Sequence, residues 1–375
     1  MSIWLFWIAL AIVAYAYAGY PLLAIGLARL LGSNPACEPL TPPLTVIVAA
    51  HNEAPRIAVR VRDILDQDYP PENLRIIVVD DGSDDGTAGA ADIGDPRVRV
   101  LRLDCNAGKA AALNAGIAAA TTDLLVFADA RQRFGHGALR MLAEPFAGPE
   151  VGAVSGELEI EIEPDDSGRA ANIGLYWRIE TALRASEARL GWLHGVSGAI
   201  HAMRREIAPT LPPGLILDDM YLPIAALFAG KRVWMAREAV ALDSGSRNEA
   251  EEFRRKLRTL AGNWQLVAKL PRLLDPFANP VWFAFVSHKL SRLLAPWALL
   301  AALVASLCAG GPFYILAFVL QLLAYLVAAA AIFSPRMTAH IPLAGTAGTF
   351  AMLNTAALLS LPACLRGSRS LWKKH

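Results

Sequence analysis

Charged residues are scarce in this chain, at 18% of 375 residues against about 25% in an average soluble domain. Positive and negative charges nearly cancel, with a formal net charge of +1, which excludes a nucleic-acid-binding protein that relies on a basic surface. A hydrophobic content of 55% excludes a disordered chain. The four cysteines form no C-x-x-C pair, so the sequence predicts neither a disulfide framework nor a zinc site.

The missing charge is concentrated in long apolar runs. No Asp, Glu, Lys or Arg occurs in residues 2–28, 293–335 or 337–365. The last of these runs contains one histidine, His340. Because about 20 apolar residues cross a bilayer as a helix, we expect an integral membrane protein with a globular domain between its apolar ends. The predicted spans are an N-terminal helix in residues 1–28 and three C-terminal helices in residues 293–365, at Leu293–Ala309, Pro312–Phe333 and Ile341–Pro362.

The first apolar run is expected to stay in the protein as a transmembrane helix. No Lys or Arg precedes it, and it continues past the small-residue pattern Ala16-Tyr17-Ala18, unlike a signal peptide. Arg29 follows it directly, which favours a cytoplasmic domain. Four spans would leave the basic C-terminus outside, against the positive-inside tendency, unless one span is not a full crossing. Residues 281–292 are an alternative re-entrant or interfacial piece.

The central region alternates strands and helices from Leu44 onward. Continuous apolar strands separated by helices are typical of a parallel sheet covered on both faces, so the predicted fold class is α/β and Rossmann-like. Ligands of such sheets bind beyond the carboxyl ends of the strands, where three polar clusters fall. The clusters are His51-Asn52-Glu53, Asp80-Asp81 and Asp129. The predicted strands are Thr45–Ala49, Arg75–Val79, Val98–Leu103 and Leu124–Phe127, and the predicted helices are Pro55–Asp66 and Ala107–Ala120.

An ordered set of short motifs resembles the membrane-bound family 2 glycosyltransferases of GT-A fold, of the cellulose, chitin, poly-N-acetylglucosamine and hyaluronan synthase type. The resemblance covers most of the chain and implies a GT-A domain at residues 40–246, followed by amphipathic interfacial helices at residues 247–292. The motifs are Val48–Glu53, Val79–Ser83, Gly108-Lys109 with Leu113-Asn114, Phe127–Ala130, Ser197-Gly198, Leu217–Asp219 and Arg255-x-x-Arg258.

The first motifs imply the site for a nucleotide-sugar donor. Asp80 and Asp81 either form an ordinary Asp-Gly-Ser turn or, at Asp81, accept a hydrogen bond from the uracil N–H. By the same resemblance Glu53 holds the ribose or base, while His51 and Asn52 line its edge. Lys109, at a helix N-terminus, is either a solvated surface residue or a ligand of the diphosphate.

Asp129 is expected to be either a strand-terminal cap or a ligand of Mg²⁺ or Mn²⁺ bound to that diphosphate. The sequence Asp129-Ala130-Arg131 departs from the D-x-D of the family, because Arg131 stands in place of the second carboxylate. Arg131 is expected either to pair with phosphate or to point away, and the departure puts a two-carboxylate metal site in doubt.

The later motifs imply catalysis. Asp219 is expected to be the catalytic base with Asp218 as support, because repulsion between adjacent carboxylates raises one pKa; the alternative is that they cap a helix. By resemblance Arg258 clamps the leaving diphosphate with Arg255 nearby, on a helix that is otherwise a basic interfacial one. The frame Arg255-x-x-Arg258-Thr259 lacks the Gln and Trp of processive synthases. Ser197-Gly198 is either a plain turn or the approach for the acceptor.

The sequence therefore predicts a membrane glycosyltransferase, an enzyme that moves a sugar from a nucleotide-diphosphate donor to a growing polysaccharide or glycan by an inverting single displacement. The expected donor is a UDP-sugar. One alternative is a non-processive transferase with a lipid-linked acceptor. Another is a non-catalytic nucleotide-sugar-binding membrane subunit, and a channel is disfavoured because ionisable residues in the spans lie near their ends. The expected location is a bacterial inner membrane, with export or assembly subunits as partners.

Overall fold

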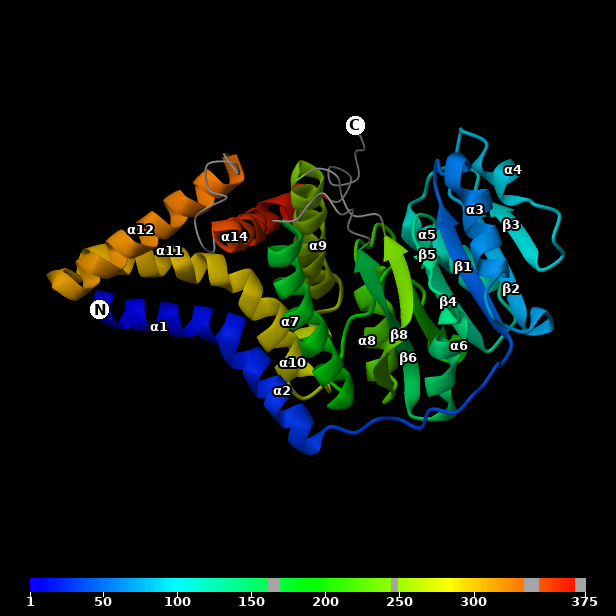
Figure 1. Ribbon diagram of the computed structural model, residues 1–375, viewed down its shortest axis with the longest axis horizontal. Coiled ribbons are helices and arrows are strands. Elements are labelled where there is room, and N and C mark those ends of the chain that lie inside the picture. Colours follow the sequence, from blue (N-terminus) through cyan, green and yellow to red (C-terminus); the bar gives the residue numbers. More distant parts are fainter. Residues whose placement is uncertain (161–168, 244–248, 334–343, 368–375) are drawn as a thin grey trace.

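The computed structural model describes residues 1–160, 169–243, 249–333 and 344–367. A helix-covered sheet forms one end of the molecule, and long helices extend from the other end (Figure 1). The predicted boundary at residues 246 and 247 and the predicted start of the last span at Ile341 lie outside the described residues.

The sheet has eight strands in the order β3-β2-β1-β4-β7-β6-β8-β5. The first four strands of this order run parallel, as the sequence predicts. The other half is mixed, because β7 is antiparallel to both β4 and β6 while β6 and β8 are parallel. The strands are β1 (Leu44–Ala50), β2 (Leu74–Asp80), β3 (Val98–Arg102), β4 (Leu124–Asp129), β5 (Arg133–Phe134), β6 (Val151–Ile160), β7 (Ile200–Arg204) and β8 (Arg232–Asp243).

Helices cover both faces of the sheet and connect it to the apolar part of the chain. The α-helices and π-helical segments are α1 (Ser2–Ala14), η1 (Tyr15–Gly19), α2 (Tyr20–Leu31), α3 (Ala54–Leu65), α4 (Thr87–Ala91), α5 (Lys109–Ala119), α6 (Ala138–Ala143), α7 (Arg169–Arg189), α8 (Asp218–Phe228), α9 (Glu249–Lys269), α10 (Trp282–Phe285), η6 (Val286–Leu290), α11 (Ser291–Ala309), α12 (Gly311–Phe333) and α14 (Ala344–Leu365). Short 3-10 turns lie at Pro71–Asn73, Glu144–Ala147, Arg205–Ile207 and Pro271–Leu274.

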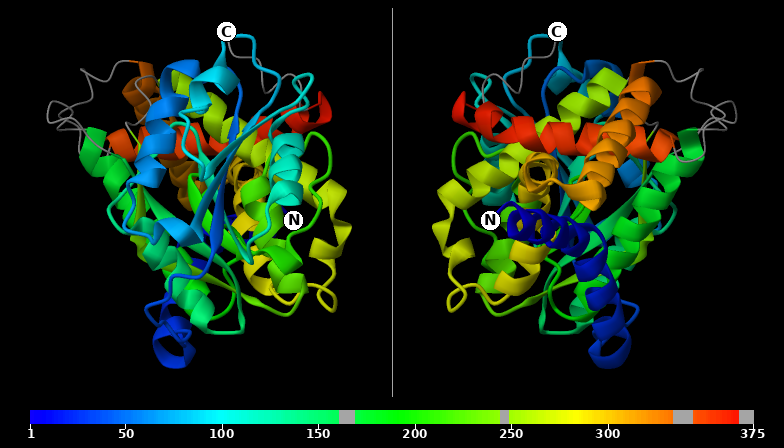
Figure 2. Two further views of the ribbon diagram at one scale, coloured as in Figure 1. Left: turned by 90° about the vertical axis from the view of Figure 1, so that its right-hand side faces the viewer. Right: turned by 90° about the vertical axis from the view of Figure 1, so that its left-hand side faces the viewer.

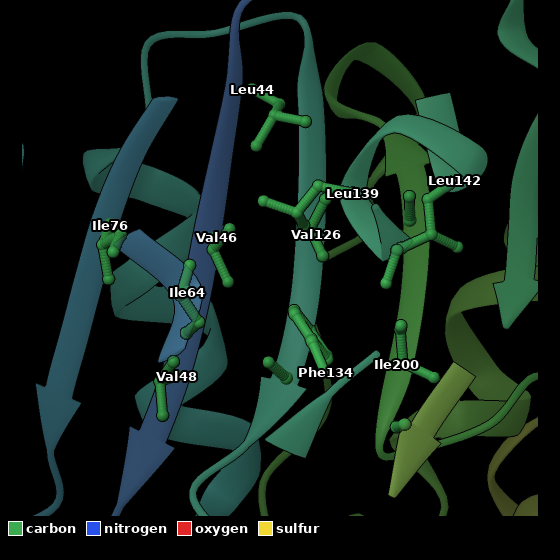
Figure 3. Packing of buried hydrophobic residues seen from close by; sticks show 14 of the residues in the cluster. Leu44, Val46, Val48, Ile64, Ile76, Val126, Phe134, Leu139, Leu142 and Ile200 are labelled. Carbon is green, nitrogen blue, oxygen red and sulfur yellow. The ribbon is translucent and has the colours of Figure 1, made fainter. Parts of the chain in front are cut away.

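Alternate side chains of the central strands enter two separate cores, as the two-residue period of a strand requires. Val46 and Val48 of β1 point to the side of α3 and α6, where Figure 3 shows them with Ile64 and Leu139. Ile47 of β1 enters the core on the side of α5. Both faces of β1 are therefore buried, which agrees with the β-branched run that predicted it.

Four helices are long and apolar enough to cross a membrane, as judged by length and composition over the described residues, which agrees with the number predicted. They are Ser2–Leu31, Trp282–Ala309, Gly311–Ile332 and Ala344–Leu365. The second begins earlier than the expected Leu293, because α10, η6 and α11 form one continuous helix. It includes His288 and Arg292, whose side chains lie 3.0 Å and 2.7 Å from Glu180 inside the protein.

The helices α7 and α9 lie between the sheet and the candidate spans, which project at the opposite end from β3 (Figure 1). The right-hand view of Figure 2 looks onto that end, where the dark blue N-terminal helix lies in front. Helix α9 packs along α14, and the indole N–H of Trp264 donates a 3.0 Å hydrogen bond to Ser360 Oγ. Trp192 packs edge-on against Phe283 at 5.6 Å between ring centroids. Both indoles thus contact the apolar helices.

Candidate active site

The three polar clusters meet at one edge of the sheet. In the parallel register Ala50 pairs with Asp80, and Ala49 pairs with Asp129, so the carboxyl ends of β1, β2 and β4 are level. The turn after β2 requires glycine, because a Cβ on Gly82 would lie 2.4 Å from the carbonyl carbon of Cys105 at a φ of +62°. The close approach of these two loops builds the first half of the site.

Asp81 holds the loop that precedes α5. Its two carboxylate oxygens accept hydrogen bonds from the backbone N–H groups of Ala107 and Gly108, each at 2.8 Å. This contact sets the start of α5 and therefore the position of Lys109. Asp80 has a different role, since its buried carboxylate accepts hydrogen bonds from the backbone N–H and hydroxyl of Ser83 within the same turn.

The first cluster surrounds this turn. His51 Nδ1 lies 2.8 Å from the carbonyl oxygen of Asp81, so Nδ1 carries the proton, and Nε2 accepts from the Asn106 amide at 2.9 Å. Asn52 has a left-handed φ of 55°, and its backbone N–H donates to Ser83 Oγ at 2.9 Å. The backbone N–H of Glu53 donates to Thr87 Oγ1.

Lys109 connects the first half of the site to the second. Its ammonium lies 3.0 Å from Asp129 Oδ1 and 3.0 Å from Asp218 Oδ2. Burial alone would lower the pKa of Lys109, but the two carboxylates outweigh it and raise this pKa above its ordinary value. The ammonium therefore stays charged between the end of β4 and the start of α8, and the solvated-surface alternative does not describe it.

Asp219 is half-buried and follows the buried Asp218 in the first turn of α8, which begins at Asp218 with Leu217 as its N-cap. Its Oδ1 atom has no hydrogen-bond partner among the described residues. Burial first, and then the charge of Asp218, raise the pKa of Asp219 to about 7. The direction agrees with the sequence analysis, although burial is the larger cause.

The turn Ser197-Gly198 lies directly against Asp219. A Cβ on Gly198 would be 3.6 Å from Asp219 Oδ2, and the backbone N–H of Val196 donates to the Asp219 carbonyl oxygen at 2.9 Å. Glycine thus leaves open space next to this carboxylate. The structure therefore brings together Asp81, Lys109, Asp129, Asp218, Asp219, Ser197 and Gly198.

Arg255 and Arg258 lie on α9. Arg255 pairs with Glu252 of its own helix at 2.5 Å. Near its N-terminus, helix α9 contacts the segment that follows β4, where Arg131 Nη1 lies 3.9 Å from Glu251 Oε1. Their roles at the diphosphate stay predictions.

Sequence reasoning missed the partner of Arg131. Asp243 has a buried carboxylate at the end of β8. Both of its oxygens accept from Arg131 Nη2 at 3.3 Å, and Oδ2 also accepts from Gln132 Nε2 at 3.1 Å. Arg131 thus points away from Asp129. A second missed residue is the buried Arg60, whose Nε donates to the Asp129 carbonyl oxygen at 3.1 Å.

His201 of β7 was also missed, although it lies in the floor of the site. Its ring stacks on Phe127 at 4.8 Å, and its Nδ1 lies 2.9 Å from the Ser197 carbonyl oxygen. Burial lowers the pKa of His201 to about 4, so the imidazole is neutral at pH 7 and supports the turn that faces Asp219.

Among the carboxylates around Lys109, that of Asp129 is more open to a divalent cation than that of Asp218. No group of three His, Cys, Asp or Glu side chains suited to a metal occurs in the part of the chain that the structure describes. Asp129 keeps a side chain that is 37% exposed, with Oδ1 shared with Lys109. Because Mg²⁺ is commonly held by one or two carboxylates together with substrate phosphates, Asp129 fits a cation that arrives with the donor.

Comparison with known proteins agrees with a sugar-transferring site on this fold. The family model described as glycosyl transferase family 2 matches residues 45–211. An N-acetylglucosaminyltransferase of Rhizobium meliloti is 30% identical over 311 residues, which are 76% of this chain and 72% of that protein. The succinoglycan biosynthesis protein ExoO of the same organism is 38% identical over 112 residues, which are 30% of this chain and 32% of that protein.

A solved structure is similar over the whole length. It is the mannosyltransferase PcManGT from Pyrobaculum calidifontis in complex with GDP-Man and Mn²⁺, with a TM-score of 0.71, 26% identity, and coverage of 99% of this chain and 100% of that chain. The fold and the site therefore define a glycosyltransferase of GT-A fold. The chain belongs to family 2 of the glycosyl transferases.

Proposed function

We propose that this enzyme transfers a sugar from a nucleoside-diphosphate donor to a hydroxyl group of an acceptor at a membrane, by an inverting single displacement. The observation that carries the proposal is Asp219, whose Oδ1 atom is buried, whose pKa is raised to about 7 and whose carboxylate faces the open turn at Gly198. A base is most effective when its pKa is near the working pH.

The reaction needs one proton transfer and one displacement. Asp219 removes the proton from the acceptor hydroxyl while its oxygen forms a bond to the anomeric carbon of the donor. The bond between that carbon and the diphosphate oxygen breaks, and the nucleoside diphosphate leaves with the electron pair. Because Asp219 approaches from the acceptor side, the displacement inverts the anomeric carbon.

The donor side would use the loop that Asp81 holds. Asp81 accepts a hydrogen bond from the base, and Lys109 lies near the diphosphate, where negative charge develops during the reaction. Arg258 is proposed to bind the same diphosphate from α9. A Mg²⁺ or Mn²⁺ ion supplies further neutralisation of that charge when bound, and Asp129 is the residue that would hold it.

For the donor sugar and the acceptor, we propose candidates to be tested rather than single compounds. The named relatives suggest N-acetylglucosamine and mannose as the first sugars to test, with UDP and GDP as carriers. A growing polysaccharide is one acceptor and a lipid-linked sugar is the other. The lipid-linked acceptor is favoured by Thr259, which stands where the processive motif has Trp.

The site is proposed to work on the cytoplasmic side of the inner membrane of a bacterium. Arg29 immediately follows the first candidate span and supports this orientation. Nucleotide sugars are made in the cytoplasm, so the donor would reach the site directly. Export or assembly subunits remain a prediction.

The function is tested by donor hydrolysis in detergent. UDP-N-acetylglucosamine and GDP-mannose are supplied with and without Mn²⁺, and release of nucleoside diphosphate is measured for the wild type, Asp219→Asn and Asp66→Asn. Asp66 is an exposed carboxylate of the same domain. We expect Asp219→Asn to lose about 10²–10⁴-fold in rate and Asp66→Asn to lose nothing. A near wild-type rate for Asp219→Asn would refute the base.

A further inference from the structure

The turn Ser197-Gly198, here called the acceptor turn, is held by side chains from two strands of the sheet. The backbone N–H of Ser197 donates to Ser155 Oγ of β6 at 2.9 Å, and the Ser197 carbonyl oxygen accepts from His201 Nδ1 of β7 at 2.9 Å. Both Ser155 and His201 are buried. The position of the acceptor turn opposite Asp219 therefore depends on groups outside the turn itself.

Arg184 of α7 reaches the acceptor turn through the same hydroxyl. Its Nη2 atom donates to Ser155 Oγ at 3.1 Å and to the carbonyl oxygen of Gly195, just before the turn, at 3.4 Å. The Ser155 hydroxyl donates its own proton to the Gly156 carbonyl oxygen at 2.8 Å. A hydroxyl has one proton and two lone pairs, so this one is fully used and its orientation is fixed. One guanidinium thus holds Gly195 directly and Ser197 through Ser155.

Helix α7 fixes Arg184 from both sides. Glu180 and Glu187 lie one helical turn before and after Arg184, on the same side of the helix. Glu180 accepts a hydrogen bond from Arg292 at 2.7 Å, and Glu187 accepts one from the Tyr20 hydroxyl at 2.7 Å. Arg292 and Tyr20 belong to two different candidate spans. The same side of α7 therefore contacts both the membrane helices and the groups that hold the acceptor turn.

The space between the acceptor turn and the proposed base is narrow. A Cβ on Gly198 would lie 3.6 Å from Asp219 Oδ2, and the backbone N–H of Val196 donates to the Asp219 carbonyl oxygen at 2.9 Å. Under the proposed function an acceptor hydroxyl reaches the Asp219 carboxylate past Gly198. Because a displacement of about 1 Å can cost a factor of about 100 in rate, the contacts that hold this turn matter for transfer as well as for folding.

We propose that Arg184 is a positioning residue of the transfer reaction, which acts through Ser155 and Gly195 to hold the acceptor turn against Asp219. This assignment rests on the proposed function and adds to it a residue that touches neither the sugar nor the nucleotide. Since α7 is anchored to two candidate spans, the position of the acceptor turn follows the position of the membrane helices.

The first measurement is the release of nucleoside diphosphate by the full-length protein in detergent, with UDP-N-acetylglucosamine and GDP-mannose as donors and water as the acceptor. We expect Arg184→Gln to lower kcat about 10–100-fold and to leave the KM of the donor unchanged, because the loop that Asp81 holds is not altered. Arg184→Lys should lie between this variant and the wild type, since an ammonium can still donate to Ser155 Oγ. Arg178→Gln, the same change at an exposed position of α7, should behave as the wild type.

The pH profile separates positioning from a loss of folded enzyme, which would lower the rate equally at every pH. In the wild type, the rate should rise with pH around the pKa of Asp219, which is about 7. A turn that has moved away admits water to this carboxylate, so in Arg184→Gln the rise should shift to lower pH, and in Arg178→Gln it should not shift. Four other charged groups act on this pKa and are unchanged in both variants, namely Asp218, Lys109, Asp129 and Lys289.

Hydrogen exchange of the Ser197 amide tests the contact without any substrate. We expect this amide to exchange about tenfold faster in Arg184→Gln, and the amide of Gly108, which donates to Asp81 on the donor side, to be unchanged. Unchanged exchange at Ser197 overturns the proposal, and so does faster exchange with a wild-type kcat and pH profile. A wild type that releases no nucleoside diphosphate counts against the proposed function instead, whereas exchange at Ser197 still decides whether Arg184 holds the turn.

Discussion

Asp218 and Asp219 are neighbours in the sequence, yet their carboxylates have different surroundings. Asp218 Oδ2 lies 3.0 Å from the ammonium of Lys109, whereas Asp219 Oδ1 is buried without a hydrogen-bond partner among the described residues. Because the charged form of Asp219 is disfavoured by burial, this residue takes up a proton far more readily than an ordinary aspartate. The same feature makes it a base and a source of instability.

The instability of Asp219 has a defined dependence on pH. Its pKa is about 7 in the folded protein and about 3.9 in an unfolded chain, so the folded state holds one more proton between these values and stability falls as pH rises through them. We therefore expect Asp219→Asn to have a higher Tm than the wild type at pH 8. The gain should shrink as the pH is lowered from about 7 towards 4. A Tm difference that is independent of pH would contradict the raised pKa.

Individual site residues were predictable where local sequence carries the signal. Asp81, Asp129 and Asp219 each follow an apolar strand or run and belong to a recognisable motif. Asp243 and Arg60 were not predicted, because their importance comes from partners that are distant in the sequence. Arg131 is 112 residues from Asp243, and Arg60 is 69 residues from Asp129. No local pattern marks either contact.

The pair of Arg131 and Asp243 permits a test at this scale. Arg131→Met leaves the Asp243 carboxylate, which is 2% exposed, with Gln132 but without its cation. Since Arg131 itself is 40% exposed, we expect the free energy of unfolding to fall by about 1–2 kcal/mol. Arg133→Met, at an exposed position two residues along, is the matched control and should change little. Equal losses in both variants would show that the ion pair is not stabilising.

At the scale of elements, α5 is held close to β1 by the absence of a side chain. A Cβ on Gly116 would lie 2.5 Å from Ile47 Cγ2, so the helix that begins with Lys109 can reach the sheet only with glycine at this position. The position of Lys109 between its two carboxylates thus depends on the contact between Gly116, near the other end of the helix, and Ile47. Helix α5 is both a core element and the support of the donor site.

The packing of α5 predicts the effect of one methyl group. We expect Gly116→Ala to lower the free energy of unfolding by about 1–3 kcal/mol, because the helix must move away from β1. Gly89→Ala is the control, since nothing lies within 4 Å of a Cβ there and its φ is not left-handed. That substitution should be neutral or stabilise by about 0.4–1 kcal/mol. Thermal unfolding of both variants measures the difference. If Gly116→Ala unfolds at the same temperature as the wild type, the contact between α5 and β1 is loose.

The elements of the first half of the sheet were predicted well, and those of the second half were not. The β-branched runs of β1 and β2 and the continuous apolar run of β4 identify buried parallel strands. Strand β6 contains Gly152 and Gly156 and shifts register twice against β8, so its sequence lacks both a continuous apolar run and clean alternation. Its assignment depends on pairing with β7 and β8, which only the tertiary structure supplies.

At the scale of the whole molecule, the orientation of the catalytic domain is open to direct measurement. Cys105 is exposed on the loop between β3 and α5, next to the proposed donor site. In a variant with the other three cysteines replaced by serine, a membrane-impermeant maleimide should label Cys105 in inside-out vesicles but not in intact cells. Labelling in intact cells would place the domain outside and refute the cytoplasmic orientation.

The pairing of α1 with α11 bears on how the chain is synthesised. Phe6 and Ala9 of α1 pack against Ala298, Ala302 and Ala305 of α11, and the entire catalytic domain is encoded between these two helices. At about 5–20 residues per second, a ribosome needs tens of seconds to translate the intervening segment. The first helix therefore waits in the bilayer without its partner while the sheet folds on the ribosome. Substitutions in α11 that weaken this late pairing should reduce the yield of assembled protein.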